Sequence, residues 1–206
     1  TLPCRVHKLE LVAPDVMVIS LKLPTNQRLQ FLAGQYIDIL LKDGKRRSFS
    51  LANAPHDDEY LELHARNYPG GVFTEHVFTN MKVKDMLRFT GPLGSFFLRD
   101  TPEECSIIFL ASGTGFAPIK SILEHVFHQE GGRHRKRNMT LYWGARTKSD
   151  LYLADLADKW QQQHDNFTFV PVLSEPLSTD NWLGRTGLVH EAVMQDFHNL
   201  AVHQVY

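Results

Sequence analysis

The chain has 206 residues, of which 43% are hydrophobic and 22% are charged, and its formal net charge is −1. This composition is ordinary for a globular protein, and the nearly neutral charge argues against electrostatic binding of nucleic acid or of an anionic membrane. Only two cysteines occur, Cys4 and Cys105, so this chain alone does not supply the four thiolates of an iron–sulfur cluster. No apolar run is long enough to span a membrane, and a cytoplasmic location is the default expectation.

The first half of the chain predicts short strands joined by turns. Turn residues at Pro14, Gly34 and Asp43-Gly44 separate apolar or alternating segments. These segments cover residues 6–12, 16–23, 35–41, 46–51, 60–66 and 86–90. The pattern predicts a closed antiparallel β-barrel, with a turn over 91–96 that closes it. One helix is expected to interrupt the strands at 70–78.

The strand at 46–51 carries an unusual combination of cations, hydroxyls and an aromatic ring. Because side chains alternate along a strand, Arg47 and Phe49 share one face, while Arg46, Ser48 and Ser50 share the other. A guanidinium beside a flat ring suits a ligand with an anionic tail and a planar head. The alternative is an edge strand with solvated arginines and a core phenylalanine.

The helix expected at 70–78 begins with Gly70-Gly71, and Thr74 follows in its first turn. Free backbone N–H groups at such a helix start, together with the threonine hydroxyl, form a natural phosphate site. The alternative interpretation is that the two glycines form only a flexible turn.

The second half predicts an α/β unit with a parallel sheet. A continuous apolar strand at 106–111 leads into Ser112-Gly113-Thr114-Gly115-Phe116-Ala117-Pro118 and then an amphipathic helix over 119–127. A glycine turn between a strand and a helix is typical of a pyrophosphate site, although the third glycine of the usual dinucleotide pattern is missing. Further strands are expected at 139–144 and 167–173, and helices at 150–163 and from 186 onward. The basic loop at 131–137 is expected to be solvated.

With these motifs in order, the chain resembles the ferredoxin–NADP reductase superfamily over essentially its whole length. The resemblance implies a flavin-binding barrel over residues 1–101 and an NAD(P)-binding α/β domain over residues 102–206. Four motifs carry it: Arg47-Ser48-Phe49-Ser50, His64-Ala65-Arg66, Gly71-Val72-Phe73-Thr74, and Gly113-Thr114-Gly115-Phe116-Ala117-Pro118.

The resemblance assigns roles to these motifs. It implies that Arg47 pairs with the pyrophosphate of FAD, and that the ring at position 49 and the hydroxyl of Ser50 contact the isoalloxazine and ribityl groups. Phe49 replaces the usual tyrosine, so stacking is kept and a phenolic hydrogen bond is lost. Thr114 is expected near the nicotinamide and the reactive edge of the flavin. Ser50 and Thr114 are the predicted catalytic residues.

Within the superfamily, the segments 2–6, 45–55 and 182–187 look most like the CDP-6-deoxy-Δ3,4-glucoseen reductase and phenol-hydroxylase reductase types. Those proteins carry an amino-terminal plant-type [2Fe–2S] domain, so the expected electron acceptor is an iron–sulfur domain or protein outside this chain. Both ends of the chain read as cuts, and the family's Cys-Gly-Pro segment would follow Tyr206.

Residues after the second and third parallel strands are expected to contact the nucleotide: Arg146, Ser174 and Glu175. NADPH-specific members place an arginine where this chain has Glu175, so NADH is favoured over NADPH, although Arg146 and Arg185 can compensate.

Two alternatives to a bound-flavin reductase stay open: a free-flavin reductase, and a non-catalytic flavin- and nucleotide-binding regulatory subunit. No metal-binding histidine pattern occurs, so no metal site is predicted.

Overall fold

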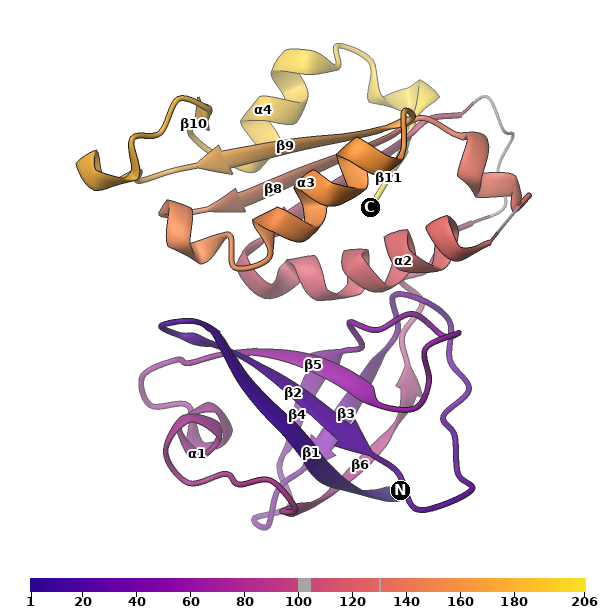
Figure 1. The fold of residues 1–206 in the computed structure, drawn as a ribbon, viewed down its shortest axis with the longest axis vertical. Coiled ribbons are helices and arrows are strands. Elements are labelled where there is room, and N and C mark those ends of the chain that lie inside the picture. The colour runs from indigo at the N-terminus through magenta and orange to yellow at the C-terminus, as the bar shows by residue number, and fades with distance from the viewer. Residues whose placement is uncertain (100–104, 130) are drawn as a thin grey trace. The chain divides into compact units, whose positions relative to one another are not determined.

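A computed structural model describes residues 1–99, 105–129 and 131–206. By their contacts these residues form two compact units (Figure 1). The first unit contains residues 1–98 and 117–128, and the second contains the described residues of 99–116 and 129–206. The predicted domain boundary between residues 101 and 102 lies outside the described residues.

The first unit is built on a six-stranded antiparallel sheet with the order β4-β3-β6-β1-β2-β5. Residues of the two edge strands, β4 and β5, lie in contact, so the sheet curls into the predicted barrel. Its elements are β1 (Leu2–Ala13), β2 (Val16–Lys22), β3 (Tyr36–Leu40), β4 (Arg46–Ser50), β5 (Leu61–Arg66), α1 (Val72–Thr79) and β6 (Met86–Leu93).

Alternate strand residues fill the inside of the barrel. Ile37 and Ile39 of β3 are fully buried, as are Leu61 and Leu63 of β5. Burying one such side chain away from water stabilises the folded state by about 1.5–3 kcal/mol. The core therefore fixes which face of each strand points inward, including the faces of β4.

The turn predicted over 91–96 is wrong in its first part, because β6 continues to Leu93, which pairs with Tyr36 of β3. A Cβ at Gly91 would lie 2.6 Å from Ile37, so glycine lets the two strands approach closely there. The strand ends at Leu93, just before Gly94, whose φ of +94° suits glycine.

The second unit contains a five-stranded parallel sheet with the order β10-β9-β8-β7-β11. Helix α3 packs against β9, and α4 packs against β7 and β8. The elements are β7 (Ile107–Ser112), β8 (Met139–Ala145), α3 (Ala154–Gln163), β9 (Phe167–Leu173), β10 (Arg185–Thr186), α4 (Val189–Asp196) and β11 (Gln204–Val205). Helix α2 (Phe116–His128) follows β7 in the chain, and by its contacts all of it after Phe116 belongs to the first unit.

Two expectations for the second unit are corrected. Helix α3 begins at Ala154 rather than at residue 150, because Asp150 instead caps a short 3₁₀ turn by accepting a 3.0 Å hydrogen bond from the Thr147 amide. In the loop expected to be solvated, Arg137 is only 1% exposed, and its Nε donates to the Cys105 carbonyl at 2.5 Å.

Two kinds of feature are absent from the described ranges. No helix there combines the length and the apolarity needed to cross a membrane. Nor do three or more His, Cys, Asp or Glu side chains in those ranges gather closely enough to hold a metal ion.

Candidate functional site

Strand β4 presents the predicted flavin motif on two faces. Arg47 pairs across the ladder with Ile39, and Phe49 pairs with Ile37. Because both isoleucines point into the core, Arg47 and Phe49 lie on the inner face and are half-buried. The prediction that these two side chains share a face is confirmed. The Nη1 atom of Arg47 donates to the carbonyl of Arg46 at 2.8 Å.

The other face of β4 carries Ser48 and Ser50. The hydroxyl of Ser48 donates to the Asp38 carboxylate at 2.6 Å, and Arg46 lies 3.9 Å from the same carboxylate. Ser50 pairs with Tyr36 and is half-buried at the end of the strand. The side chains of Ser48 and Ser50 thus lie on the opposite face from Arg47 and Phe49.

Helix α1 brings the predicted phosphate turn to the same part of the barrel. The rings of Phe49 and Phe73 lie 5.4 Å apart with a tilt of 56°. Gly71 caps the helix, and a Cβ there would lie 2.4 Å from Oγ1 of Thr74. That hydroxyl donates to the Gly71 carbonyl at 3.1 Å. Strand β4 and the glycine turn of α1, which are separate in sequence, therefore meet at an aromatic pair.

An acidic side chain already occupies part of this turn. Glu75 accepts a 2.7 Å hydrogen bond from the Gly70 amide. A phosphate bound to the same amide would have to displace this carboxylate, because both are anions. Val72, the first helical residue, is exposed.

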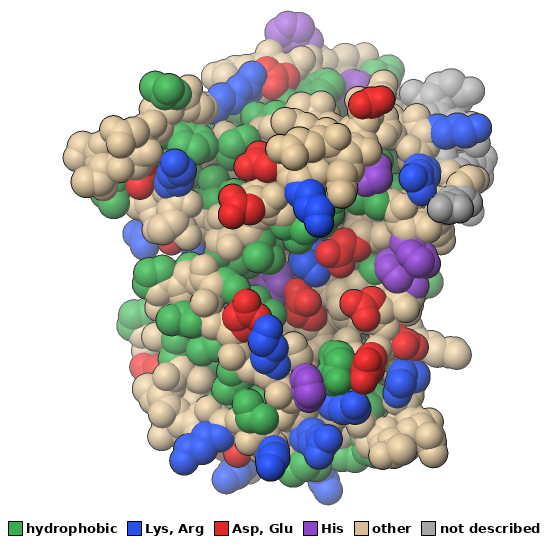
Figure 2. All heavy atoms as spheres, in the orientation of Figure 1, with side chains coloured by type: hydrophobic (Ala, Val, Ile, Leu, Met, Phe, Trp, Pro, Cys, Tyr) green, Lys and Arg blue, Asp and Glu red, His purple; other side chains and the backbone are tan. Residues whose placement is uncertain are grey.

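An open pocket of about 1230 Å³ lies next to these motifs, between the β3–β4 hairpin, α1 and β6. Its lining combines apolar side chains with four bases and two acids. The apolar residues include Leu40, Val72, Phe73 and Leu87, the basic ones are Lys42, Arg46, His76 and Arg88, and the acidic ones are Asp43 and Asp85. Figure 2 shows lysine and arginine side chains gathered at the lower end of the first unit. Such a lining suits an anionic group attached to a flat or apolar one.

The three residues of the predicted motif on β5, at positions 64–66, all pack against or pair with other groups of the protein. His64 is 4% exposed, and its Nε2 lies 2.8 Å from the Glu62 carboxylate. Arg66 forms an ion pair with Asp15 at 3.3 Å. Ala65 is fully buried in the core. These side chains support the barrel wall in the structure.

Glu62 belongs to a buried charge cluster with His64, Lys120 and Glu124. Lys120, on α2, lies 3.2 Å from Glu62 and 3.1 Å from Glu124. Burial alone would raise the pKa of Glu62, but the His64 hydrogen bond and the Lys120 charge lower that pKa to about 2. Burial lowers the pKa of His64 and raises the pKa of Glu124. Near neutral pH, Glu62 is therefore the ionised partner of Lys120, and His64 is neutral.

In the second unit, the predicted nucleotide turn connects β7 to α2. Gly113, Thr114 and Gly115 form a short 3₁₀ turn, and Gly113 has a φ of +54°. A Cβ at Gly115 would meet no described atom within 4 Å, so a ligand can approach the backbone there. The first residue of α2, Phe116, is fully buried.

Trp143 of β8 supports this turn, a role that the sequence did not predict. Its Nε1 donates to the Gly113 carbonyl at 3.0 Å, and its ring stacks on Phe116 at 3.9 Å with an angle of 12°. Trp143 is fully buried. The only hint in the sequence is its place one residue before Gly144, near the end of a parallel strand.

The polar residues predicted after strands β8 and β9, which are Arg146, Ser174 and Glu175, lie side by side through main-chain hydrogen bonds. The Glu175 amide donates to the Arg146 carbonyl at 2.9 Å, and the Ser174 amide donates to the Ala145 carbonyl at 2.9 Å. The side chains of Arg146, Ser174 and Glu175 are all exposed. Ligands of open α/β sheets bind at this edge.

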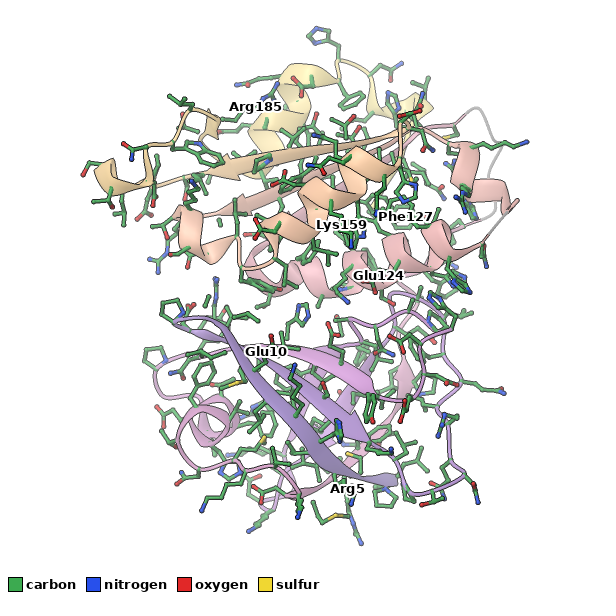
Figure 3. All side chains as sticks on the ribbon, in the orientation of Figure 1. Arg5, Glu10, Glu124, Phe127, Lys159 and Arg185 are labelled. Carbon is green, nitrogen blue, oxygen red and sulfur yellow. The ribbon has the colours of Figure 1, made fainter. Side chains whose placement is uncertain are left out.

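Arg185, the second cation considered for a nucleotide phosphate, is held by α4 (Figure 3). Its Nη2 forms an ion pair with Asp196 at 2.5 Å, and its Nη1 donates to the Ala192 carbonyl at 3.1 Å. The Tyr142 hydroxyl donates to the same aspartate at 2.5 Å. The Arg185 hydrogen bond lowers the pKa of Asp196, so this pair stays charged at neutral pH.

Two family models match the chain. The oxidoreductase FAD-binding domain covers residues 3–98, and the oxidoreductase NAD-binding domain covers residues 109–206. These matches confirm the predicted fold class and the two cofactor classes, FAD and a nicotinamide nucleotide.

Curated and solved relatives agree with this assignment. The chain is 41% identical to the CDP-6-deoxy-L-threo-D-glycero-4-hexulose-3-dehydrase reductase of Yersinia pseudotuberculosis serotype I (strain IP32953), covering 100% of this chain and 60% of that protein. It is 30% identical to a component of the Na⁺-translocating NADH-quinone reductase of Shewanella putrefaciens, covering 94% of this chain and 75% of that protein. The crystal structure of the Amycolatopsis cytochrome P450 reductase GcoB matches with a TM-score of 0.87 and 33% identity, covering 99% of this chain and 60% of that chain. The chain thus spans about 60% of the length of the first relative.

Proposed function

Because the chain belongs to the ferredoxin–NADP reductase family of FAD- and NAD-binding oxidoreductases, we propose that it forms the flavin- and nucleotide-binding part of an NADH-dependent reductase. Bound FAD supplies the chemistry, since it accepts a hydride from the nicotinamide and releases the electrons singly to an acceptor. The observation that carries the proposal is that Arg47 and Phe49 share the inner face of β4, with the ring of Phe73 on α1 5.4 Å from the ring of Phe49.

The residues present fit a flavin. Within the described residues, the guanidinium of Arg47 donates only to the neighbouring main chain and has no carboxylate partner, so it is available to a diphosphate. Phe49 offers a half-buried ring against which a flat ring system can stack. The amides at the start of α1 add donors for phosphate, and the Thr74 hydroxyl would add another once it releases the Gly71 carbonyl. The adjoining basic and apolar pocket suits the nucleotide end of the same ligand.

The nucleotide turn provides orientation. Backbone amides at the junction of Gly113–Gly115 with α2 lie at the helix start, where a pyrophosphate is stabilised. Thr114 supplies a hydroxyl for the nicotinamide, and Ser50 supplies one for the flavin. No side-chain acid or base is needed, because the transferred hydride carries its electron pair between the two ring systems.

The residues at the strand ends favour NADH. Glu175 is exposed and bonded through its main chain beside Arg146, so its charge opposes a 2′-phosphate placed at this edge. Arg185 is already paired with Asp196 and is therefore less available to compensate.

We propose an iron–sulfur domain or protein as the electron acceptor. The support is that two relatives are named as reductases of another protein, one of a sugar dehydrase and the other of a cytochrome P450, and the iron–sulfur choice follows from the reductase types that the sequence resembles. A second candidate is a free-flavin reductase, favoured by Phe49, whose ring lacks the phenolic hydroxyl that would bind the flavin more tightly.

The first test is a visible spectrum of the chain after FAD is added and the excess is removed. NADH and NADPH are then added separately without oxygen. Retained flavin absorbance that bleaches faster with NADH is the expected result. Catalytic reduction of free FAD without retention would favour the free-flavin reductase, and no interaction with flavin would refute both.

A further inference from the structure

Asp196, the last residue of α4, binds the side chain of Arg185 on β10, which Figure 3 labels. One carboxylate oxygen pairs with Nη2 of Arg185 at 2.5 Å, and the other accepts a hydrogen bond from the Tyr142 hydroxyl at 2.5 Å. The second terminal nitrogen of the guanidinium, Nη1, donates to the Ala192 carbonyl at 3.1 Å. We call this arrangement the Asp196 latch. All of its residues belong to the second unit.

The main chain of Arg185 is fixed near the carboxyl-end edge of the parallel sheet. Arg185 pairs with Val172 of β9, and its carbonyl accepts a hydrogen bond from Nε1 of Trp182 at 2.8 Å. Val172 lies two residues before Ser174, which corresponds to about 7 Å along the strand. Because the main chain is held, the side chain is the part of Arg185 that can turn. Once released, its guanidinium can extend toward the edge where Ser174 lies.

The latch directs the guanidinium away from that edge. A Cβ at Gly144, near the carboxyl end of β8, would lie 2.9 Å from Val189, the first residue of α4. The helix therefore starts at the carboxyl-end edge and runs back over the sheet, where Ala192 belongs to the same buried cluster as Ile108 near the start of β7. Asp196 lies one turn beyond Ala192 and so holds the guanidinium over the interior of the sheet.

The latch also decides whether the charge of Arg185 is available to a ligand. An arginine near the ribose is the usual group that accommodates the 2′-phosphate of NADP. In the latch, the Asp196 carboxylate neutralises the Arg185 charge, and both terminal nitrogens of the guanidinium already donate hydrogen bonds. The two side chains are 39% and 29% exposed, so this ion pair contributes little to stability and can be broken without unfolding the chain.

We propose that Asp196 is a specificity residue, which withholds Arg185 from the 2′ position of the nucleotide and so excludes NADPH. The proposal rests on the proposed function, because it needs a nicotinamide nucleotide at this edge of the sheet. The role differs from that of Glu175, whose charge repels a 2′-phosphate directly. Asp196 acts instead by removing an attractive group. Loss of the Asp196 carboxylate should therefore improve binding of a 2′-phosphate even while Glu175 is present.

The test measures binding of AMP and of adenosine 2′,5′-bisphosphate to the whole chain by titration calorimetry. Asp196→Asn removes the charge but keeps a carbonyl oxygen that can accept from Tyr142. It should bind the bisphosphate roughly tenfold more tightly than the parent, because a charge-assisted contact is gained, and AMP within about twofold. Asp196→Ala is a second variant and should show the same gain. The matched control is Asp158→Asn, which removes an exposed carboxylate from α3 and should leave both affinities at parent values.

Arg185→Ala identifies the source of the gain. Alone, it should change the affinity for the bisphosphate by less than about twofold, because the latched guanidinium does not reach the ligand. In the Asp196→Asn background, the same substitution should abolish the gain, so the two changes are strongly non-additive. Anaerobic bleaching of bound FAD gives a second readout. There, Asp196→Asn should raise the ratio of kcat/KM for NADPH to that for NADH by a factor similar to the gain in binding.

Three results would overturn the proposal: no gain in Asp196→Asn, a gain that persists without Arg185, or an equal gain in Asp158→Asn. In each case, AMP binding and bleaching by NADH in the parent would leave the proposed function standing. If the parent neither binds AMP nor is bleached by NADH, the proposed function itself fails and the specificity role fails with it.

Discussion

Trp143→Phe is the sharpest test of how the nucleotide turn is supported. The substitution keeps an aromatic ring in β8 but removes the Nε1 donor that lies 3.0 Å from the Gly113 carbonyl, and it reduces the face stacked on Phe116. A buried carbonyl that loses its donor costs about 1–3 kcal/mol. A stacked aromatic pair contributes about 0.5–1.5 kcal/mol beyond its buried area. Because Trp143 and Phe116 are both fully buried, we expect a loss of about 2–4 kcal/mol in the free energy of unfolding.

The functional consequence should be confined to the nucleotide. Urea unfolding followed by circular dichroism measures stability, and titration with NADH and with FAD measures the two affinities. We expect weaker NADH binding and an unchanged FAD dissociation constant. The control is Trp160→Phe on α3, whose ring packs edge-on against Phe167 and lies 6.0 Å from Phe116. This change leaves the Trp143 donor to the Gly113 carbonyl in place, so it should cost stability without weakening NADH binding. Unchanged unfolding free energy and NADH affinity in Trp143→Phe would refute the assigned role.

Three further predictions concern the flavin strand, the nucleotide edge and the buried histidine. Arg47→Ala should weaken FAD binding roughly 10- to 100-fold, since hydrogen bonds to charged groups contribute about 1.5–3 kcal/mol. Arg5→Ala, at an exposed arginine on β1, should not weaken it, and equal effects would contradict the specific role of Arg47. Glu175→Arg should raise the ratio of kcat/KM for NADPH to that for NADH by roughly tenfold, and an unchanged ratio would place the ribose elsewhere. Burial lowers the pKa of His64 below its ordinary 6.5, so its contribution to stability is complete above pH 6.5 and is lost as the pH falls. The free energy of unfolding should therefore decrease from neutral pH toward pH 5 less steeply in His64→Gln than in the parent, and parallel curves would exclude His64 as a source.

Local patterns predicted the strands and their facing because those depend on neighbours in sequence. Alternation placed Arg47 and Phe49 together, and the apolar run before Gly113 identified a buried parallel strand. The features missed depend on contacts between distant residues. Lys120 and Ser121 lie in an amphipathic helix, where a polar residue is normally solvated. Nothing in the local sequence indicates that they donate hydrogen bonds to the main-chain carbonyls of residues 52 and 53. Arg137 was misjudged for the same reason, since its partner Cys105 is distant in sequence.

The arrangement of β4 offers a reason why the proposed flavin site lies where the two edge strands of the barrel, β4 and β5, meet. Strands β4 and β5 are the two edges of the sheet, so each has main-chain groups that no ladder partner among the described strands satisfies. An edge of this kind is usually covered or charged, and β4 has an inward guanidinium and an inward ring beside its open edge. Under the proposed function, FAD lies along this edge and takes donors from Arg47 and α1. The open edge of β4, where the hydrogen-bonded sheet ends, then provides the site. It follows that substitutions on β5 that do not touch the ligand can still alter flavin affinity by moving the neighbouring edge of β4.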